Sequence, residues 1–174
     1  MTGVQTCALP IYLHYFSKIL AFLSNINPGE LSINSLAQNM GLDHKTTQHY
    51  MQILKEIGLI RLPETEQHGN ARLRKAQKAY MHNTTLLSAL SHVAGEEPNV
   101  GMIRECFFLQ AVSGQQPVFY SQVGGFKTKG HLFEIGGKNK PKLQLQGREG
   151  WLVKDDILVA TKESIPLILF GFLY

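Results

Sequence analysis

Apolar residues in the first part of the chain recur at the spacing of amphipathic helices, whereas those of the last part alternate or cluster as in short strands. Helical spacing covers 12–26, 36–40, 50–57, 84–93 and 102–112. The triplet Asn27-Pro28-Gly29 ends the first run, and the polar stretch 94–99 is typical of a linker. The pattern therefore predicts a group of helices, then one further helix and a sheet.

The most specific signal lies in residues 34–62, NSLAQNMGLDHKTTQHYMQILKEIGLIRL. Gly41 can adopt the positive φ that ends a short first helix, and Asp43 can cap a second helix by accepting from its first free amides. Gly58 then ends the second helix, and 59–62 is expected to be a strand. The inner side of the second helix should carry Tyr50, Met51, Ile53, Leu54 and Ile57. This spacing predicts a winged helix-turn-helix.

The outer side of the second helix is polar and suits a nucleic acid. Its residues are Lys45, Gln48, His49, Gln52 and Lys55, types that reach phosphates and base edges in a major groove. A second basic group, formed by Arg72, Arg74, Lys75 and Lys78, follows a polar loop at 63–70 and predicts a basic wing that contacts phosphates. The alternative is a winged helix used only for packing or protein contact, because fold does not determine function.

Beyond residue 113 the apolar runs are short and bounded by Gly, Pro or Asn, which is typical of strands. The expected strands are 117–121, 132–135, 142–145, 151–153 and 165–173. A helix followed by a sheet indicates a small α/β or α+β unit. The expected fold class is α+β.

Composition adds weak constraints. The 174 residues carry 17 Lys and Arg against 13 Asp and Glu, a net charge of +4 that permits a nucleic-acid partner. Cys7 and Cys106 have no companions at metal-ligand spacing, so we expect neither a disulfide framework nor a metal site, and a reducing cytoplasm is the expected location. The apolar run 165–173 is far shorter than the ~20 residues of a membrane helix, so no membrane partner is expected.

Residues 1–11, MTGVQTCALPI, show no periodic apolar face that would prepare the helix after them. The string TGVQTCALPI resembles the conceptual translation of a common sequencing adapter. We therefore expect 1–11 to be an assembly artefact joined to a gene fragment whose true N-terminal sequence is missing. A signal peptide is the alternative, but neither a basic n-region nor a small-residue cleavage site is present.

Longer motifs carry a resemblance to a known family. They are RKAQKAYMHNTTLLSAL at 74–90, GMIRECFFLQAV at 101–112, FEIGGKNK at 133–140 and IPLILFGFLY at 165–174. Together with the winged helix they resemble the C-terminal half of Bacteroidetes-type AAA ATPases. The resemblance implies a winged helix-turn-helix at 12–83, a helix and linker at 84–99, and a restriction-endonuclease-like PD-(D/E)XK domain at 100–174.

The ATP-binding module of such an ATPase precedes this part in the family. No G-x-x-x-x-G-K-[ST] loop occurs in the chain, so ATP and Mg²⁺ are expected only in a missing N-terminal ATPase module, with no cofactor here. That module is an expected partner, beside double-stranded DNA.

A PD-(D/E)XK nuclease holds a divalent metal with carboxylates beside a lysine. By resemblance, Glu105 and Glu134 fall on two acidic positions, and Lys138 is the lysine nearest to the E-x-K motif. The acid expected before Phe126 is Gly125 instead, and the lysine expected two residues after Glu134 is a glycine. The site is therefore predicted to be degenerate and the chain not to be an enzyme. Five lysines around this strand could still grip a phosphate backbone: Lys127, Lys129, Lys138, Lys140 and Lys142.

Three hypotheses follow from the sequence. The first is a non-catalytic, DNA-binding or regulatory C-terminal part of an AAA-type ATPase. The second is a protein-interaction module in which the winged helix packs on the ATPase module. The third is a metal-dependent nuclease with a rearranged site. Salt-dependent duplex binding separates the first from the second, and magnesium-dependent cutting would establish the third.

Overall fold

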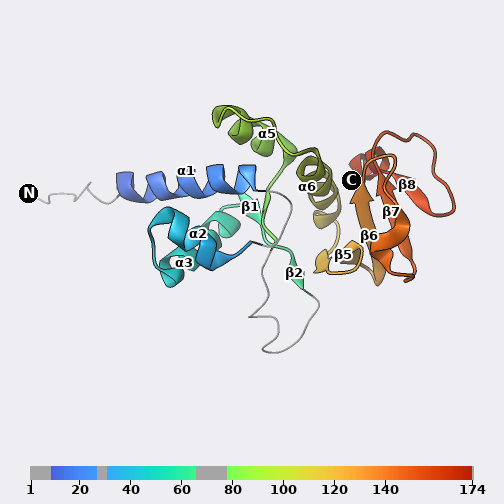
Figure 1. Cartoon of the computed structure of the whole chain (residues 1–174), viewed down its shortest axis with the longest axis horizontal. Coiled ribbons are helices and arrows are strands. Elements are labelled where there is room, and N and C mark those ends of the chain that lie inside the picture. The colour runs from blue at the N-terminus through green and yellow to red at the C-terminus, as the bar shows by residue number, and fades with distance from the viewer. Residues whose placement is uncertain (1–8, 27–30, 66–77, 174) are drawn as a thin grey trace, which may run out of the picture.

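The structure is a computed structural model that describes residues 9–26, 31–65 and 78–173. It is a mixed α+β fold with helices gathered at one end and a sheet at the other (Figure 1). The helical half contains α1 (Leu9–Asn25), α2 (Ile33–Met40), α3 (His44–Glu56), β1 (Ile60–Arg61), β3 (Tyr80–Met81) and α5 (Thr84–Val93). The sheet half contains β2 (Glu64–Thr65), α6 (Val100–Ser113), β4 (Phe119–Ser121), β5 (Gly125–Thr128), β6 (His131–Gly136), η1 (Lys142–Leu145), β7 (Gly150–Lys154), β8 (Ser164–Pro166) and η2 (Leu167–Phe172).

The helical half has the elements of a winged helix. α2 packs on α1 and on α3, and Tyr50 of α3 lies against the Tyr15 and Phe16 rings of α1. β1 pairs antiparallel with β3 through Ile60↔Met81 and Arg61↔Tyr80. Gly41 ends α2 with φ 66°, and Gly58 follows α3 with φ 75°, so both turns use the positive φ that glycine allows. The predicted helices and the strand after α3 are therefore present.

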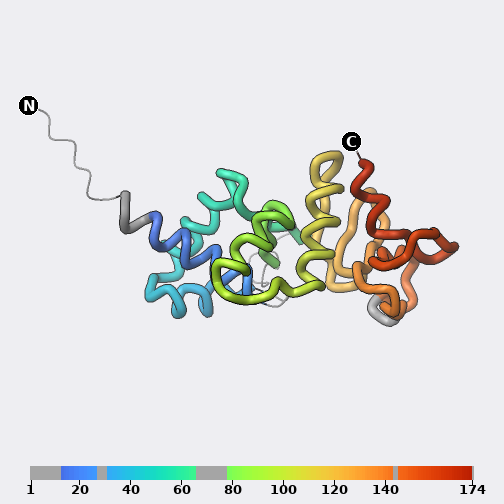
Figure 2. The backbone as a smooth tube through the Cα atoms, turned by 90° about the horizontal axis from the view of Figure 1, so that it is seen from above, coloured from blue at the N-terminus to red at the C-terminus, as the bar shows by residue number. Residues whose placement is uncertain are grey.

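The sheet half contains one six-stranded sheet in the order β2-β4-β5-β6-β7-β8. β4, β5 and β6 form an antiparallel meander, and β7 and β8 continue it in parallel to β6. β2, from the predicted segment 12–83, pairs in parallel with β4, so the sheet joins both halves. α6 stands between the helical half and β6 in both views (Figures 1 and 2).

Two hydrophobic cores meet at α6 and β3. Met81 on β3 and Cys106 on α6 lie in the core of the helical half, with α1, α2, α3 and α5. Tyr80 on β3 and Phe108 on α6 lie in the core of the sheet half. Because adjacent side chains of a strand point to opposite sides, β3 forms a wall between the two cores. In the segment 84–99, predicted to be a helix and a linker, the helix is α5, which packs on α1.

Two expected strands are short helices instead. Residues 142–145 form η1 because β6 and β7 are parallel, and parallel neighbours need a crossover connection between them. Residues 165–173 were predicted as one strand, but β8 ends at Pro166 and η2 follows. Proline has no N–H for a sheet ladder, and the apolar run after it packs on α6.

Further differences concern short or marginal signals. The sequence pattern does not predict β2 or β5, because β2 has two residues and β5 has four. In β5 only Phe126 and Thr128 are buried, so the alternation is too short to stand out. α1 begins at Leu9, before the predicted start at residue 12, since a proline is tolerated in the first helical turn. Ile57 is 59 % exposed and lies outside the core to which it was assigned. None of the helices in the described ranges combines the length and the apolar character needed to cross a membrane.

Candidate nucleic-acid interface and the cavity of the sheet half

The start of α3 is set by a local cap. The Asp43 carboxylate accepts hydrogen bonds from the Thr46 amide at 2.9 Å and from the Thr46 hydroxyl at 2.6 Å. These bonds hold the pKa of Asp43 below its ordinary value, because they favour the charged form. The cap fixes which residues of α3 face outward.

The two sides of α3 differ as the sequence pattern predicts. Its buried residues are Thr47, Tyr50, Met51 and Leu54, and all five predicted DNA-contacting residues, Lys45, Gln48, His49, Gln52 and Lys55, are exposed. The Gln52 amide donates to Glu56 Oε1 at 2.7 Å. Within the described ranges, no acidic side chain forms an ion pair with Lys45 or Lys55. Both cations are therefore available to an external anion.

Most of the predicted basic wing lies outside the residues that the structure describes. Arg72, Arg74 and Lys75 lie outside the described residues. Lys78, assigned to the same basic group, turns inward: its side chain is 12 % exposed, and its Nζ lies 3.4 Å from Glu105 Oε2. Lys78 is therefore not a free phosphate contact.

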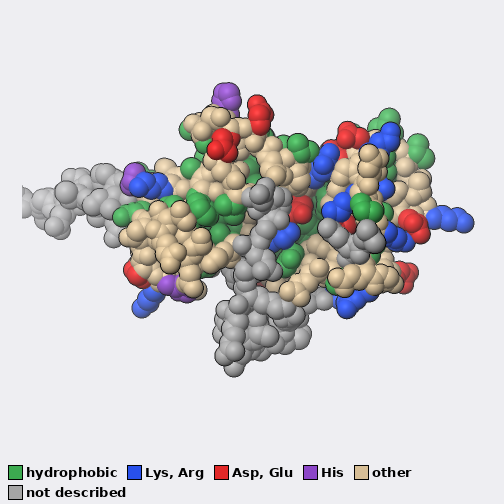
Figure 3. All heavy atoms as spheres, in the orientation of Figure 1, with side chains coloured by type: hydrophobic (Ala, Val, Ile, Leu, Met, Phe, Trp, Pro, Cys, Tyr) green, Lys and Arg blue, Asp and Glu red, His purple; other side chains and the backbone are tan. Residues whose placement is uncertain are grey.

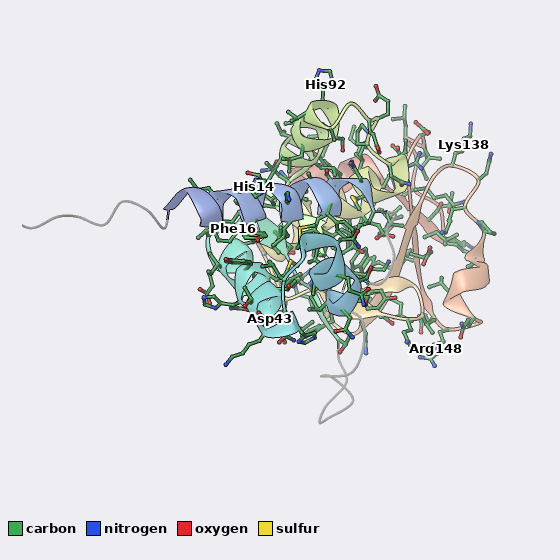
Figure 4. All side chains as sticks on the ribbon, turned by 60° about the vertical axis from the view of Figure 1, so that its left-hand side comes forward. His14, Phe16, Asp43, His92, Lys138 and Arg148 are labelled. Atoms are coloured by element: carbon green, nitrogen blue, oxygen red, sulfur yellow. The ribbon has the colours of Figure 1, made fainter. Side chains whose placement is uncertain are left out.

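A cavity of about 640 Å³ opens between α6 and the meander β4–β6. Its lining is rich in charged side chains: Lys78, Arg104, Glu105, Glu134 and Lys140. The structure thus brings together the two acids that the sequence assigned to the nuclease-like site. Lys138 does not line the cavity, and Figure 4 shows it at the outer rim of the sheet half, pointing away.

Glu134 is paired with Lys140. Its side chain is 6 % exposed, and its Oε1 lies 2.7 Å from Lys140 Nζ. The aliphatic stem of Lys140 crosses over Gly136, where a Cβ would come within 2.6–2.7 Å of that stem. The missing side chain at Gly136 therefore makes room for Lys140 to reach Glu134. The lysine of the FEIGGKNK motif that contacts Glu134 is therefore Lys140, and Lys138, the lysine nearest to the E-x-K spacing, does not line this cavity.

The residues present do not fit a divalent metal. Glu105 and Glu134 line the same cavity, but the described part of the chain contains no group of three His, Cys, Asp or Glu side chains that could hold a metal ion. A Cβ at Gly125 would lie 3.7 Å from Glu134 Oε2. The position beside Glu134 where the resemblance implies an acid is therefore occupied by a glycine, which offers no carboxylate. A divalent cation needs several oxygen ligands, and here a lysine already neutralises Glu134.

The remaining charged groups of this region are structural. Arg104 Nε lies 3.0 Å from Asp155 Oδ2, and Arg104 Nη2 lies 3.7 Å from Asp156 Oδ2. Asp156 has φ 60° at the bend after β7, as expected of a residue that turns the chain. The Lys142 ammonium lies 2.9 Å from Glu163, away from the cavity lining. Two of the five lysines around β6, Lys140 and Lys142, are therefore paired with acids.

Two buried groups where the two cores meet, Tyr80 on β3 and Cys106 on α6, are held in their protonated forms. Burial raises the pKa of Tyr80 well above its ordinary value, and the nearby charge of Glu105 adds to this effect. Burial raises the pKa of Cys106 to about 11, so its thiol is not a nucleophile at neutral pH. Tyr80 and Cys106 serve as hydrogen-bond donors, to Glu105 Oε2 at 2.5 Å and to the Met81 carbonyl at 3.3 Å.

Comparison with known proteins identifies a family for the helical half. The family described as "Domain of unknown function (DUF8612)" matches residues 5–97. The chain belongs to this family. The DUF8612 match covers α1 to α5 and begins within the segment 1–11, whereas Glu105 and Glu134 lie beyond it.

Other comparisons add little. A solved structure with limited similarity is the homodimeric winged helix-turn-helix DNA-binding domain of a possible ArsR-family transcriptional regulator from Mycobacterium bovis. It shares 19 % identity, and the alignment covers 55 % of this chain and 88 % of that chain with a TM-score of 0.32. No curated protein matches the sequence.

Proposed function

We propose that the helical half binds double-stranded DNA, with the outer side of α3 in the major groove. The observation that carries the proposal is the exposed face of Lys45, Gln48, His49, Gln52 and Lys55 on a helix whose opposite side is core. Lysines neutralise phosphates, and glutamines can pair with adenine edges in the groove. The β1–β3 pair beside α3 is the arrangement in which winged helices present such a helix.

We also propose that this unit serves an ATPase module. The motifs around 74–90, 101–112, 133–140 and 165–174 support a C-terminal, non-catalytic role beside an AAA-type module, and they support a degenerate nuclease-like fold for the sheet half. The order helix, antiparallel meander, parallel strand is consistent with that fold. The DNA-binding half would then direct the ATPase module to its substrate.

The test is duplex binding by fluorescence anisotropy at several salt concentrations. Lys45→Ala and Lys55→Ala should each flatten the slope of log affinity against log salt by about 0.9, the value for one lost phosphate contact. The matched control is Lys162→Ala, which removes an exposed cation from the sheet half and should leave the slope unchanged. Gln48→Ala should cost about 1–3 kcal/mol on a preferred sequence only. Absence of duplex binding at low salt would favour the protein-interaction alternative.

The nuclease alternative rests on one observation, that Glu105 and Glu134 line the same cavity with a lysine at the second acid. Since the described residues do not form a metal site, we rank nuclease activity below DNA binding and derive no catalytic step. The test is incubation of linear and single-stranded DNA with Mg²⁺ or Mn²⁺. Cutting that disappears in Glu134→Gln would establish nuclease activity, and no cutting would leave the cavity a structural feature.

A further inference from the structure

Glu105 is the point where the sheet half holds β3, the strand that pairs with β1 beside α3. Its Oε2 accepts from the Tyr80 hydroxyl at 2.5 Å and lies 3.4 Å from Lys78 Nζ. The side chains of Lys78 and Glu105 are 12 % and 18 % exposed, and Tyr80 is 1 % exposed. Lys78 Nζ also lies 5.0 Å from the ring centroid of Tyr120 on β4. Buried hydrogen bonds to a charged group are costly to break, so these contacts fix the start of β3.

β3 is linked to α3 through β1. Tyr80 pairs with Arg61 and Met81 pairs with Ile60 on β1, the strand that follows α3. The His82 amide donates to the Leu59 carbonyl at 2.9 Å, which extends the pairing. Met81 and Ile60 then pack in the same core as Tyr50, Met51 and Leu54 on the inner side of α3. A shift of β3 would therefore change the contacts that set the position of α3.

Glu105 is carried by α6, a helix that packs into the cores of both halves. α6 places Met102 and Cys106 in the core of the helical half, and it places Phe108 and Leu109 in the core of the sheet half. Glu105 directly precedes Cys106 on the same helix. Packed side chains move between discrete arrangements and do not deform continuously. A displacement in one half should therefore shift the other half through α6.

We propose that Glu105 is a positioning residue through which the sheet half sets the affinity of α3 for DNA. The inference rests on the proposed function and names how that function is controlled. Coupling of this kind is reciprocal, so DNA bound to α3 must also stabilise the contacts of Glu105 with Tyr80 and Lys78.

The first test is duplex affinity and its salt dependence in Glu105→Gln and Tyr80→Phe. Glu105→Gln removes the charge that holds Lys78, and Tyr80→Phe removes the hydroxyl donor. We expect ~5-fold weaker binding in each at fixed low salt, the lower end of typical coupling. The salt slope should stay unchanged, because no phosphate contact is lost. This result separates the variants from Lys45→Ala and Lys55→Ala, which flatten the slope.

The second test is amide hydrogen exchange of the free protein and of its duplex complex. Exchange at Ile60 and Met81, and in α3, should be faster in Glu105→Gln than in wild type, and DNA should slow exchange around residue 105 in wild type only. The matched control is Glu163→Gln, which removes an ion pair with Lys142 of 2.9 Å next to β8, at the opposite edge of the sheet from β2. It should change neither binding nor exchange in α3.

The outcomes are separable. Wild-type binding and exchange in Glu105→Gln and Tyr80→Phe would show the inference to be wrong. If Glu105→Gln fails to fold, Lys78→Gln decides, since it removes the ion pair with Glu105 and leaves the Tyr80–Glu105 hydrogen bond in place. If wild-type protein does not bind duplex DNA, the proposed function fails. Exchange in α3 then decides the positioning role alone: faster exchange in Glu105→Gln supports it, and unchanged exchange excludes it.

Discussion

The outer side of α3 and the cavity of the sheet half use the same kinds of residue in opposite ways. Lys45 and Lys55 on α3 are exposed and have no acidic partner among the described residues. The cavity cations Lys78, Arg104 and Lys140 are only 12–26 % exposed, and each is paired with an acid. DNA binding needs exposed cations that can neutralise phosphates and so release the counterions condensed on the DNA. A buried ion pair, in contrast, mainly fixes the position of its own two groups. A basic composition alone therefore does not locate a DNA-binding surface.

The molecular surface shows the same contrast. On the face in Figure 3, Lys and Arg side chains gather over the sheet half and lie among Asp and Glu side chains. Cations that are interspersed with acids create little net field. The cations on this face of the sheet half are thus weaker candidates for nucleic-acid binding than the exposed lysines of α3. Loss of the Lys140–Glu134 pair should alter stability, and changes to the exposed lysines of α3 should alter binding with little effect on stability.

The largest expected effect is on the core that the cavity residues depend on. Phe108 is fully buried, and its ring lies 4.9 Å from Phe170 and 5.5 Å from both Phe126 and Phe133 by centroid distance. Phe108→Ala should lower the free energy of unfolding by about 3–5 kcal/mol. Urea unfolding can be followed by Trp151 fluorescence for the sheet half and by far-UV circular dichroism for the helices. Both transitions should shift together, because α6 belongs to both cores.

The control for Phe108→Ala is Leu158→Ala, a change at a side chain that is 84 % exposed. It should alter stability by no more than about 0.5 kcal/mol. A shift seen by Trp151 but absent from the circular dichroism signal would mean that the halves unfold independently.

A smaller effect is expected from the paired cation of the cavity. Lys140→Met leaves the buried Glu134 carboxylate without a partner and should destabilise the protein by about 2–3 kcal/mol, somewhat less than loss of a fully buried pair. Lys142→Met is the matched control, since the Lys142–Glu163 pair is 43 % and 64 % exposed and should contribute less than about 1 kcal/mol. Equal effects of the two substitutions would contradict the distinction between buried and exposed pairs. Glu134→Gln added to Lys140→Met should restore part of the loss.

The smallest effect concerns the cap of α3 and depends on pH. The pKa of Asp43 is lowered by its hydrogen bonds with Thr46, so its contribution to stability is present above the unfolded value near 3.8. That contribution is lost as pH falls through the lower folded value. Asp43→Ala should therefore reduce Tm at pH 7, and the difference from wild type should shrink below pH ~3.8. Asp43→Asn keeps an acceptor oxygen and should show a smaller loss; a difference independent of pH would contradict the charged cap.

Local signals allowed much of the helical half to be predicted. Gly41, Asp43 and Gly58 mark the ends of α2 and α3 because capping and positive φ depend only on neighbouring residues. The exposed side of α3 follows from helical periodicity once the cap is known. The family match over 5–97 falls on the same half.

The cavity required the folded chain. Tyr80 and Glu105 lie 25 residues apart in sequence, and only the packing of β3 against α6 brings the hydroxyl to the carboxylate. Lys140 reaches Glu134 because β6 ends in a turn and Gly136 leaves room for the lysine stem, whereas the spacing of the motif pointed to Lys138. Strand pairing, burial and ion pairing between distant segments depend on contacts that periodicity does not encode. The pattern of residues therefore specified which face of α3 is exposed, and tertiary packing alone selected which charges of the sheet half are neutralised.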